Sequence, residues 1–321
     1  MQNAGSVQVG PLRQNELGEA ERIVRLAFGT FLAMPDPLEF MGDRSFAASR
    51  WAASHVKALA ARHDGHLIGS NFATRWGSFG FFGPLTVLPE YWDRGVAQRL
   101  LIDTMDIFHA WGVSHTGLFT FAHSPKHVGL YQKFGYWPRY LTAIMTHTPK
   151  DGAKPGGQKA GNAVLISSLD ASRREQEIEA CRKLTHQIDE GLDLSGEIRA
   201  ALEQRTGDIV LLSMGGELDA FAICLHGPGS EGGEQACYIK FAAARSGPGA
   251  GDRFDALLEA CDRFAVSRCA AIEAGVNLAR EDAYRRMRAH GYRTAIQGVA
   301  MHRPHAGSFN RSDVYVIDDW R

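Results

Sequence analysis

The chain lacks the features that mark secreted, membrane-spanning and nucleic-acid-binding proteins. Its five cysteines are an odd number without a Cys-x-x-Cys pair, which is typical of reduced thiols in a cytoplasmic protein. No apolar run approaches the roughly eighteen residues of a membrane span, and the N-terminus lacks a basic-then-apolar signal pattern. The formal net charge is −1, so no excess of positive charge is present for nucleic acid or an anionic membrane. We therefore expect a cytoplasmic protein without nucleic-acid or membrane partners.

What is present is the composition of an ordinary globular protein with more than one domain. Hydrophobic residues make up 45% and charged residues 22% of 321 positions, a length that favours two domains. Residues 150–163 are polar and glycine-rich without apolar periodicity, which is typical of a flexible linker. The predicted domains are therefore residues 1–149 and 164–321.

The two halves resemble each other. A helix closed by Gly135-Tyr136 leads into a strand closed by His147-Thr148-Pro149, and His290-Gly291-Tyr292 leads likewise into a strand closed by His302-Arg303-Pro304. The segments 95–99 and 249–253 correspond at a similar offset, so we predict two tandem copies of one α/β unit.

Two stretches of the first copy carry the chemistry. Residues 84–101 read as an apolar strand, a tight glycine turn and a helix, where unpaired amides and the positive helix end attract a phosphate. Gly95 and Ala97 keep this turn free of side chains, so a pyrophosphate can approach the backbone. Residues 130–136 end a second helix, and Tyr131 there is a potential proton donor. Together they indicate group transfer from a phosphate-bearing carrier.

These stretches resemble the signature of the GNAT superfamily of N-acetyltransferases, which use acetyl-coenzyme A. The family pattern Gln/Arg-x-x-Gly-x-Gly/Ala is matched by Gly95-Val96-Ala97, although Trp92 occupies its opening position. The pattern Leu-Tyr-x-Lys-x-Gly-Phe/Tyr is matched at residues 130–136, and the family's frequent asparagine before it is Ser124 here. The resemblance covers residues 9–149.

The resemblance implies a fold, a reaction and a set of site residues. The expected fold class is α/β, with two tandem GNAT-like units, each a mixed, mostly antiparallel sheet flanked by helices. The expected reaction is transfer of an acyl group, acetyl first, from acetyl-CoA to a primary amine by direct attack. Tyr131 would be the general acid, and His123, at the end of a strand facing the cleft, is a candidate base. Asp36, Glu39 and a water chain are the alternatives for the base. A backbone amide near Val87 would polarise the thioester carbonyl. The expected cofactor-binding residues are Leu85, Thr86, Val87, Asp93, Arg94, Gly95, Val96, Ala97, Ser124 and Lys133.

The sequence leaves an alternative function, the acceptor and the oligomeric state open. A protein that binds acyl-CoA as a sensor without transferring the acyl group is the alternative function, motivated by Trp92 and Ser124. The acceptor is an amine on a small molecule or a peptide, and a homodimer is left open. His123 and His127 have helical spacing, but Pro125 intervenes and no third ligand follows, so we expect no metal site.

The second copy departs from the signature, because Met287 stands where the tyrosine would be and a thioether cannot donate a proton. We expect it to be degenerate and structural or substrate-shaping. The first copy shows no final strand of its own, whereas the tail 313–320 alternates like a surplus strand. We therefore expect intimate packing of the copies, with the tail on a sheet edge near the centre of the molecule. The alternative is a tail that belongs to the second copy alone. Among the local predictions, residues 44–60 read as mostly helical and 80–88 as one strand.

Overall fold

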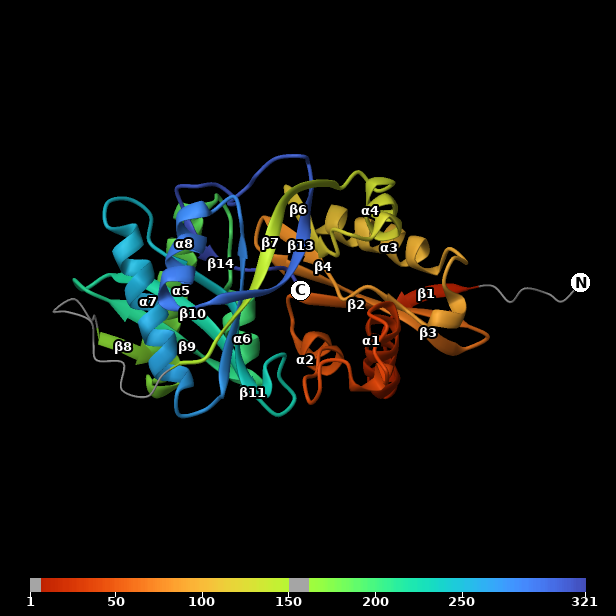
Figure 1. Cartoon of the computed structure of the whole chain (residues 1–321), viewed down its shortest axis with the longest axis horizontal. Helices are drawn as coiled ribbons and strands as arrows, with labels where there is room; N and C mark the ends of the chain where they lie inside the picture. The colour runs from red at the N-terminus through yellow and green to blue at the C-terminus, as the bar shows by residue number, and fades with distance from the viewer. Residues whose placement is uncertain (1–6, 150–161) are drawn as a thin grey trace, which may run out of the picture.

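A computed structural model describes residues 7–149 and 162–321, so most of the predicted linker at 150–163 lies outside the described residues. The two halves lie side by side along the longest axis of the molecule, and they share one sheet of 14 strands (Figure 1). Within the described ranges, no helix has the length and apolar character that a membrane crossing requires.

The first half is a sheet with helices α1 and α2 on one side and α3 and α4 on the other (Figure 1). Its helices are α1 Leu17–Phe31, α2 Ala47–Ala52, α3 Val96–Trp111 and α4 Pro125–Gln132. Its strands are β1 Gln8–Pro11, β2 Val56–His63, β3 His66–Trp76, β4 Phe79–Phe82, β5 Thr86–Val87, β6 His115–Thr120 and β7 Trp137–His147.

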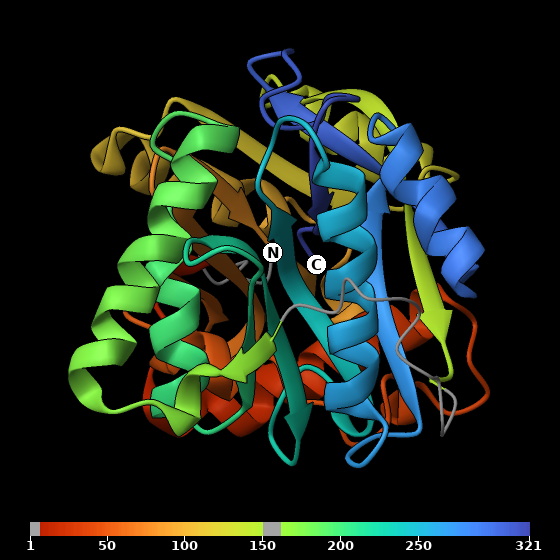
Figure 2. The same cartoon turned by 90° about the vertical axis from the view of Figure 1, so that its left-hand side faces the viewer.

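The second half repeats this plan, with α5 and α6 on one face of its strands and α7 and α8 on the other (Figure 2). Alternate residues of its strands enter two separate cores: Leu211 and Ile223 pack towards α5 and α6, and Leu212 and Cys224 towards α7. Its helices are α5 Ala171–Ile188, α6 Ser195–Glu203, α7 Ala250–Ala265 and α8 Glu281–His290. Its strands are β8 Asn162–Leu165, β9 Gly207–Ser213, β10 Leu218–Gly227, β11 Gly233–Ala244, β12 Ala271–Asn277, β13 Arg293–Arg303 and β14 Tyr315–Ile317.

The halves exchange one strand each. The strand order is β1-β2-β3-β4-β6-β13-β7-β12-β11-β10-β9-β8, so β13 of the second half lies between β6 and β7 of the first. In the same way, β7 lies between β13 and β12, and Figure 1 shows both strands running together at the centre of the molecule. The intimate packing that the sequence predicts is therefore confirmed.

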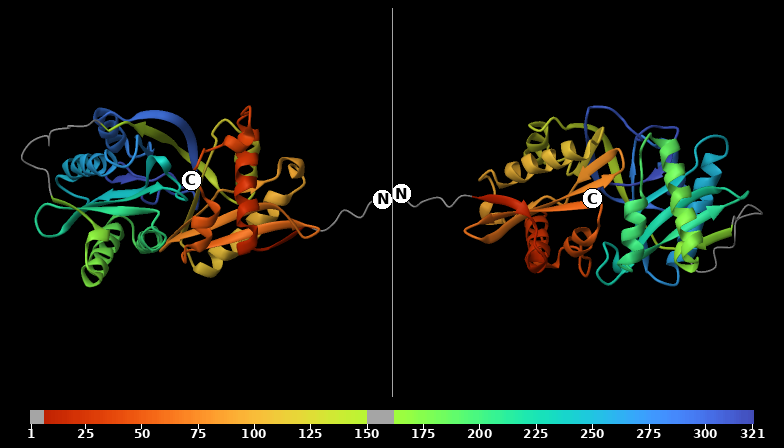
Figure 3. Two further views of the ribbon diagram at one scale, coloured as in Figure 1. Left: turned by 90° about the horizontal axis from the view of Figure 1, so that it is seen from below. Right: turned by 180° about the vertical axis from the view of Figure 1, so that it is seen from behind.

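The strand that completes the first half is not the predicted one. β13 pairs with β6 from Val299↔Thr120 to Arg303↔Thr116, whereas β14 of the tail pairs with β11 of its own half. The end of the tail still reaches the junction, and the C-terminus lies between the halves in both views of Figure 3. There the Trp320 ring packs 4.9 Å from the Phe79 ring, centroid to centroid.

Two local predictions are wrong. Residues 44–60, expected to be mostly helical, contain the short helix α2 and then the strand β2 from Val56 onwards. The strand expected at 80–88 is interrupted, because Gly83 has a φ of +146° and Pro84 has no N–H for a ladder hydrogen bond. This interruption separates β4 from β5 and creates the opening described next.

Candidate active site

A cavity of about 830 Å³ opens where two strands of the first half diverge. β4 pairs in parallel with β6 only from Phe79 to Phe81, after which the chain turns and β5 pairs with β3 instead. The gap between β5 and β6 is lined by α1, the start of α3 and one face of α4, and also by residues of the second half. Predicted cofactor residues Leu85, Thr86 and Val87 lie on its wall.

The backbone of Val87 faces this gap. In the pairing of β5 with β3, Thr86 is opposite Ser70 and Val87 opposite Gly69, and the Leu88 N–H donates to the Ile68 carbonyl at 2.8 Å. Hydrogen-bonded and non-hydrogen-bonded pairs alternate along antiparallel strands, so the N–H and C=O of Val87 point away from β3. The carbonyl accepts a hydrogen bond from Trp92 Nε1 at 2.7 Å. The Val87 N–H is thereby directed into the gap, and Trp92 has a structural role in the turn.

The turn before α3 has the geometry of an anion cradle. Gly95 has a φ of +78° and precedes the helix, whose first backbone bond runs from the Arg99 N–H to the Gly95 carbonyl at 3.2 Å. The amides of Val96, Ala97 and Gln98 therefore have no partner within the helix, and they sit at its positive end.

Charged residues flank this cradle. Asp93 is exposed, with a φ of +61°, and forms an ion pair with Lys126 at 2.8 Å. The Arg94 guanidinium lies 5.3 Å from the centroid of the Tyr91 ring. Lys126 of α4 and Lys133, the residue after α4, both line the cavity, and the ion pair with Asp93 places Lys126 beside the anion cradle.

Helix α4 presents Tyr131 and His127 to the cavity. The two residues are four positions apart and so share one helix face. Both line the cavity, and the Tyr131 side chain is 7% exposed and packs against Phe82. Burial raises the pKa of the Tyr131 phenol well above its usual value, so the hydroxyl keeps its proton at neutral pH.

The structure places His127, rather than His123, on the cavity wall. Ser124 begins α4 by capping it, accepting a hydrogen bond from the His127 N–H, and its Oγ lies 2.7 Å from His127 Nδ1. Burial lowers the pKa of His127, helped by the neighbouring Lys126 charge, which favours the neutral imidazole at pH 7. His123 is exposed beside Phe31, and neither it nor Ser124 lines the described cavity.

The far end of the cavity is built by residues of the second half that sequence reasoning missed. Glu273 on β12 accepts two hydrogen bonds from Arg44, at 3.0 and 3.1 Å, and one from Arg321 at 2.6 Å. Burial by itself raises the pKa of Glu273, but the Arg321 and Arg44 charges outweigh it and lower the pKa to about 2. Glu231 and Trp320 also line this end. No local motif marks these residues, because only the strand exchange brings them to the cavity.

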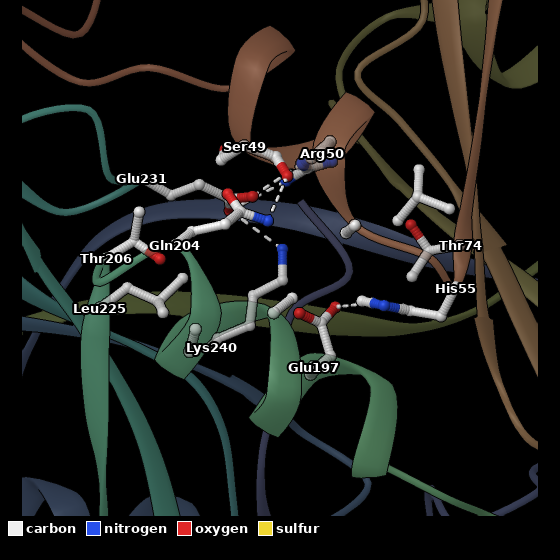
Figure 4. Close-up of a pocket in the computed structure, with 14 residues that line it drawn as sticks. Ser49, Arg50, His55, Thr74, Glu197, Gln204, Thr206, Leu225, Glu231 and Lys240 are labelled. Carbon is white, nitrogen blue, oxygen red and sulfur yellow. Dashed lines mark hydrogen bonds and ion pairs between the residues drawn. The ribbon is translucent and has the colours of Figure 1, made fainter. Parts of the chain in front are cut away.

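Glu231 also belongs to a buried ionic cluster between the halves (Figure 4). Its carboxylate accepts from Arg50 of α2 at 2.7 and 2.9 Å and from Lys240 of β11 at 2.9 Å. Beside this cluster, His55 Nε2 lies 3.2 Å from Glu197 Oε1, and both residues line a small cavity of about 30 Å³. The volume suits about one water molecule, so this smaller cavity belongs to the junction between the halves.

The corresponding gap between the strands of the second half is closed. β11 and β12 also diverge after a short parallel pairing, but β14 pairs with β11 from Ala242 to Ala244, and the Asp318 N–H donates to the Gly275 carbonyl of β12 at 3.0 Å. At the start of α7, a Cβ on Gly251 would lie 2.4 Å from the Arg286 guanidinium carbon. The tail therefore closes the strand gap that stays open in the first half, whereas a separate cavity of about 640 Å³ remains at the start of α7, lined by Gly249, Gly251, Arg286 and Tyr315 among others.

One grouping of metal-type side chains is found among the described residues, outside the cavity. His147 and His290 place their Nε2 atoms 3.3 and 2.8 Å from Asp262 Oδ2. The shared carboxylate holds the end of β7, a first-half strand, against α7 and α8. This grouping does not include His123 and His127, the histidine pair considered from the sequence.

Comparison with known proteins identifies the first half. Residues 25–136 match the family model of the acetyltransferase (GNAT) family. Residues 25–136 are a GNAT domain. Curated proteins offer no match to the sequence.

Solved structures extend the likeness to the whole chain. A putative acetyltransferase from Pyrococcus horikoshii superposes with a TM-score of 0.68 at 14% identity, covering 98% of this chain and 95% of that one. A GCN5-related N-acetyltransferase from Sphaerobacter thermophilus gives 0.58 at 14%, covering 92% and 95%. A tandem GNAT protein from the clavulanic acid biosynthesis pathway gives 0.58 at 11%, covering 92% and 98%. The predicted fold class, two tandem GNAT-like units, is thus confirmed.

Proposed function

We propose that the chain is an N-acyltransferase that moves an acetyl group from acetyl-CoA to a primary amine. The observation that carries the proposal is a single cavity containing the α3 amides, the Val87 N–H and the Tyr131 side chain. The described residues fit the donor, because small residues and free amides at the start of α3 suit a pyrophosphate. Acetyl-CoA would supply the acyl group as a thioester that an amine attacks with loss of a thiolate.

Each residue then has a defined task. The Val87 N–H donates a hydrogen bond to the thioester carbonyl oxygen as negative charge develops there. Tyr131 keeps its proton at neutral pH and donates it to the departing sulfur. His127, fixed through Nδ1 by Ser124, is neutral at pH 7 and accepts the amine proton at Nε2.

Binding and turnover test these tasks separately. Isothermal titration should detect acetyl-CoA binding to the wild type and lose it in Ala97→Glu, which places a carboxylate at the cradle. Tyr131→Phe should lower kcat by about 10²-fold with an unchanged acetyl-CoA Kd, because the phenol acts only as the thiolate leaves. Absence of binding at millimolar acetyl-CoA would overturn the proposal.

His127→Gln and His123→Gln form a matched pair for the base. The His127 variant should lower kcat and remove the acidic limb of the pH–rate profile, and the His123 variant should leave both unchanged. Equal effects of the two substitutions would remove His127 from the mechanism. Tight acetyl-CoA binding without thiol release over a broad amine panel would favour the sensor function instead.

A further inference from the structure

One wall of the cavity is made of aromatic rings. Phe28 and Phe31 of α1, Phe40 of the following segment and Phe121 after β6 all line the cavity, and all four are partly buried. Ring centroids lie 5.2 Å apart for Phe28 and Phe40, 6.3 Å for Phe28 and Phe121, and 5.0 Å for Phe31 and Phe121. The rings form one continuous apolar wall, which we call the aromatic wall. Ile296, on the exchanged strand β13, adds a 49% exposed apolar side chain to the lining.

The carboxylates of the cavity are already paired. Three line it among the described residues: Asp93 pairs with Lys126, Glu273 with Arg44 and Arg321, and Glu231 with Arg50 and Lys240. Glu231 and Glu273 each face two cations, so an acceptor with several ammonium groups would find no unpaired carboxylate beside these residues. Moving unpaired charges out of water into such an apolar space is strongly unfavourable.

We propose that the acceptor is a small primary amine with an apolar, aromatic or branched body and no second charge. This inference rests on the proposed function. Such an amine enters the reaction neutral, leaves no uncompensated charge in the cavity, and buries its apolar body against the aromatic wall. Polyamines, aminoglycosides and lysine side chains of peptides lack that match of shape and charge.

Kinetics with an amine panel test the acceptor class. At saturating acetyl-CoA, kcat/KM for phenethylamine should exceed that for spermidine, an aminoglycoside and a lysine-containing peptide by at least about 10-fold. Phe31→Ala should raise the KM for phenethylamine several-fold while the acetyl-CoA Kd stays unchanged, and Phe40→Ala is a second variant from another segment. Leu38→Ala is the matched control, because Leu38 is 44% exposed in the same region and does not line the described cavity.

A binding measurement separates failure of this inference from failure of the proposed function. Titration of each amine into CoA-saturated protein reports acceptor preference even if no acyl transfer occurs. Tighter binding of phenethylamine than of spermidine supports the acceptor class whether or not thiol is released. A preference for spermidine, the aminoglycoside or the peptide in either assay, or equal effects of Phe31→Ala and Leu38→Ala, would overturn it.

Discussion

Replacing Glu231 with Gln should destabilise the junction between the halves more than any comparable surface change. The Glu231 side chain is 5% exposed, and its two cationic partners, Arg50 and Lys240, are 5% and 4% exposed. Glutamine keeps the volume but removes the charge, so two buried cations lose their counter-ion. Breaking a buried ion pair by neutralising one partner costs about 3–5 kcal/mol.

The control is Glu175→Gln, which removes the same charge from an exposed pair. Glu175 accepts two hydrogen bonds from Arg199 at 2.5 and 2.6 Å, but its side chain is 56% exposed and solvent replaces the lost interaction. Thermal and urea unfolding of both variants should therefore separate burial from charge. At roughly 2–4 °C per kcal/mol, the Glu231 variant should lose about 6–20 °C in Tm, and the Glu175 variant very little. Equal losses in the two variants would refute the reasoning.

The pH dependence of the Glu231 effect has a defined sign. Burial raises the pKa of Glu231, but the Arg50 and Lys240 charges outweigh it and lower the pKa below its usual 4.5. The carboxylate therefore contributes its stability above about pH 4.5, and this contribution is lost as the pH falls through the lower, folded-state pKa. The difference in unfolding free energy between wild type and Glu231→Gln should be complete at pH 7 and narrow below about pH 4.5.

Three further outcomes are expected. Gly117→Ala should lower the free energy of unfolding in urea by about 1–3 kcal/mol, because the new Cβ would lie 2.6 Å from the Trp320 ring. The control Gly18→Ala should cause no loss of stability, because its Cβ meets no described atom within 4 Å. Burial lowers the pKa of His115 to about 4 and of its partner His302 to about 3, so the unfolded chain alone takes up protons below about pH 6.5. Urea midpoints should consequently fall from pH 7 to pH 5, with a shallower decline in His115→Gln. Titration should give one acetyl-CoA per chain, and two would contradict closure of the second cleft by β14.

The placement of the cradle, Val87 and Tyr131 could be predicted because it depends on local sequence. A tight turn with a positive φ at Gly95 and a helix face that carries Tyr131 depend on neighbours within a few residues. The structure accordingly brings the cradle, Val87 and Tyr131 together as expected from the sequence. His127 was missed as a cavity residue because its orientation depends on where α4 begins, which the Ser124 cap determines.

The errors arise where tertiary contacts override local preference. Residues 57–61 are Lys-Ala-Leu-Ala-Ala, good helix formers, yet they form β2 between β1 and β3, with Ala60 and Ala61 fully buried. The wall that the second half contributes to the cavity could not be predicted at all. Glu273 and Glu231 reach the cavity from another half of the chain, and no spacing in the sequence records that approach.

The strand exchange explains why a degenerate copy is retained. Val299 of β13 pairs with Thr120 of β6, and Val276 of β12 pairs with Ala143 of β7. Val299 lies 156 residues after Ala143, and Val276 lies 156 residues after Thr120. The two pairings are therefore equivalent in the repeat and related by the same offset. The last long strand of each half, β7 or β13, therefore pairs with the sheet edge of the other half. The arrangement is that of a two-fold symmetric interface between identical subunits. Since β13 covers the edge of β6, the sheet that carries the cradle is complete only when the second half is present. The second half needs no cradle of its own to remain indispensable, because it supplies this strand and the Glu231 and Glu273 carboxylates that line the far end of the cavity.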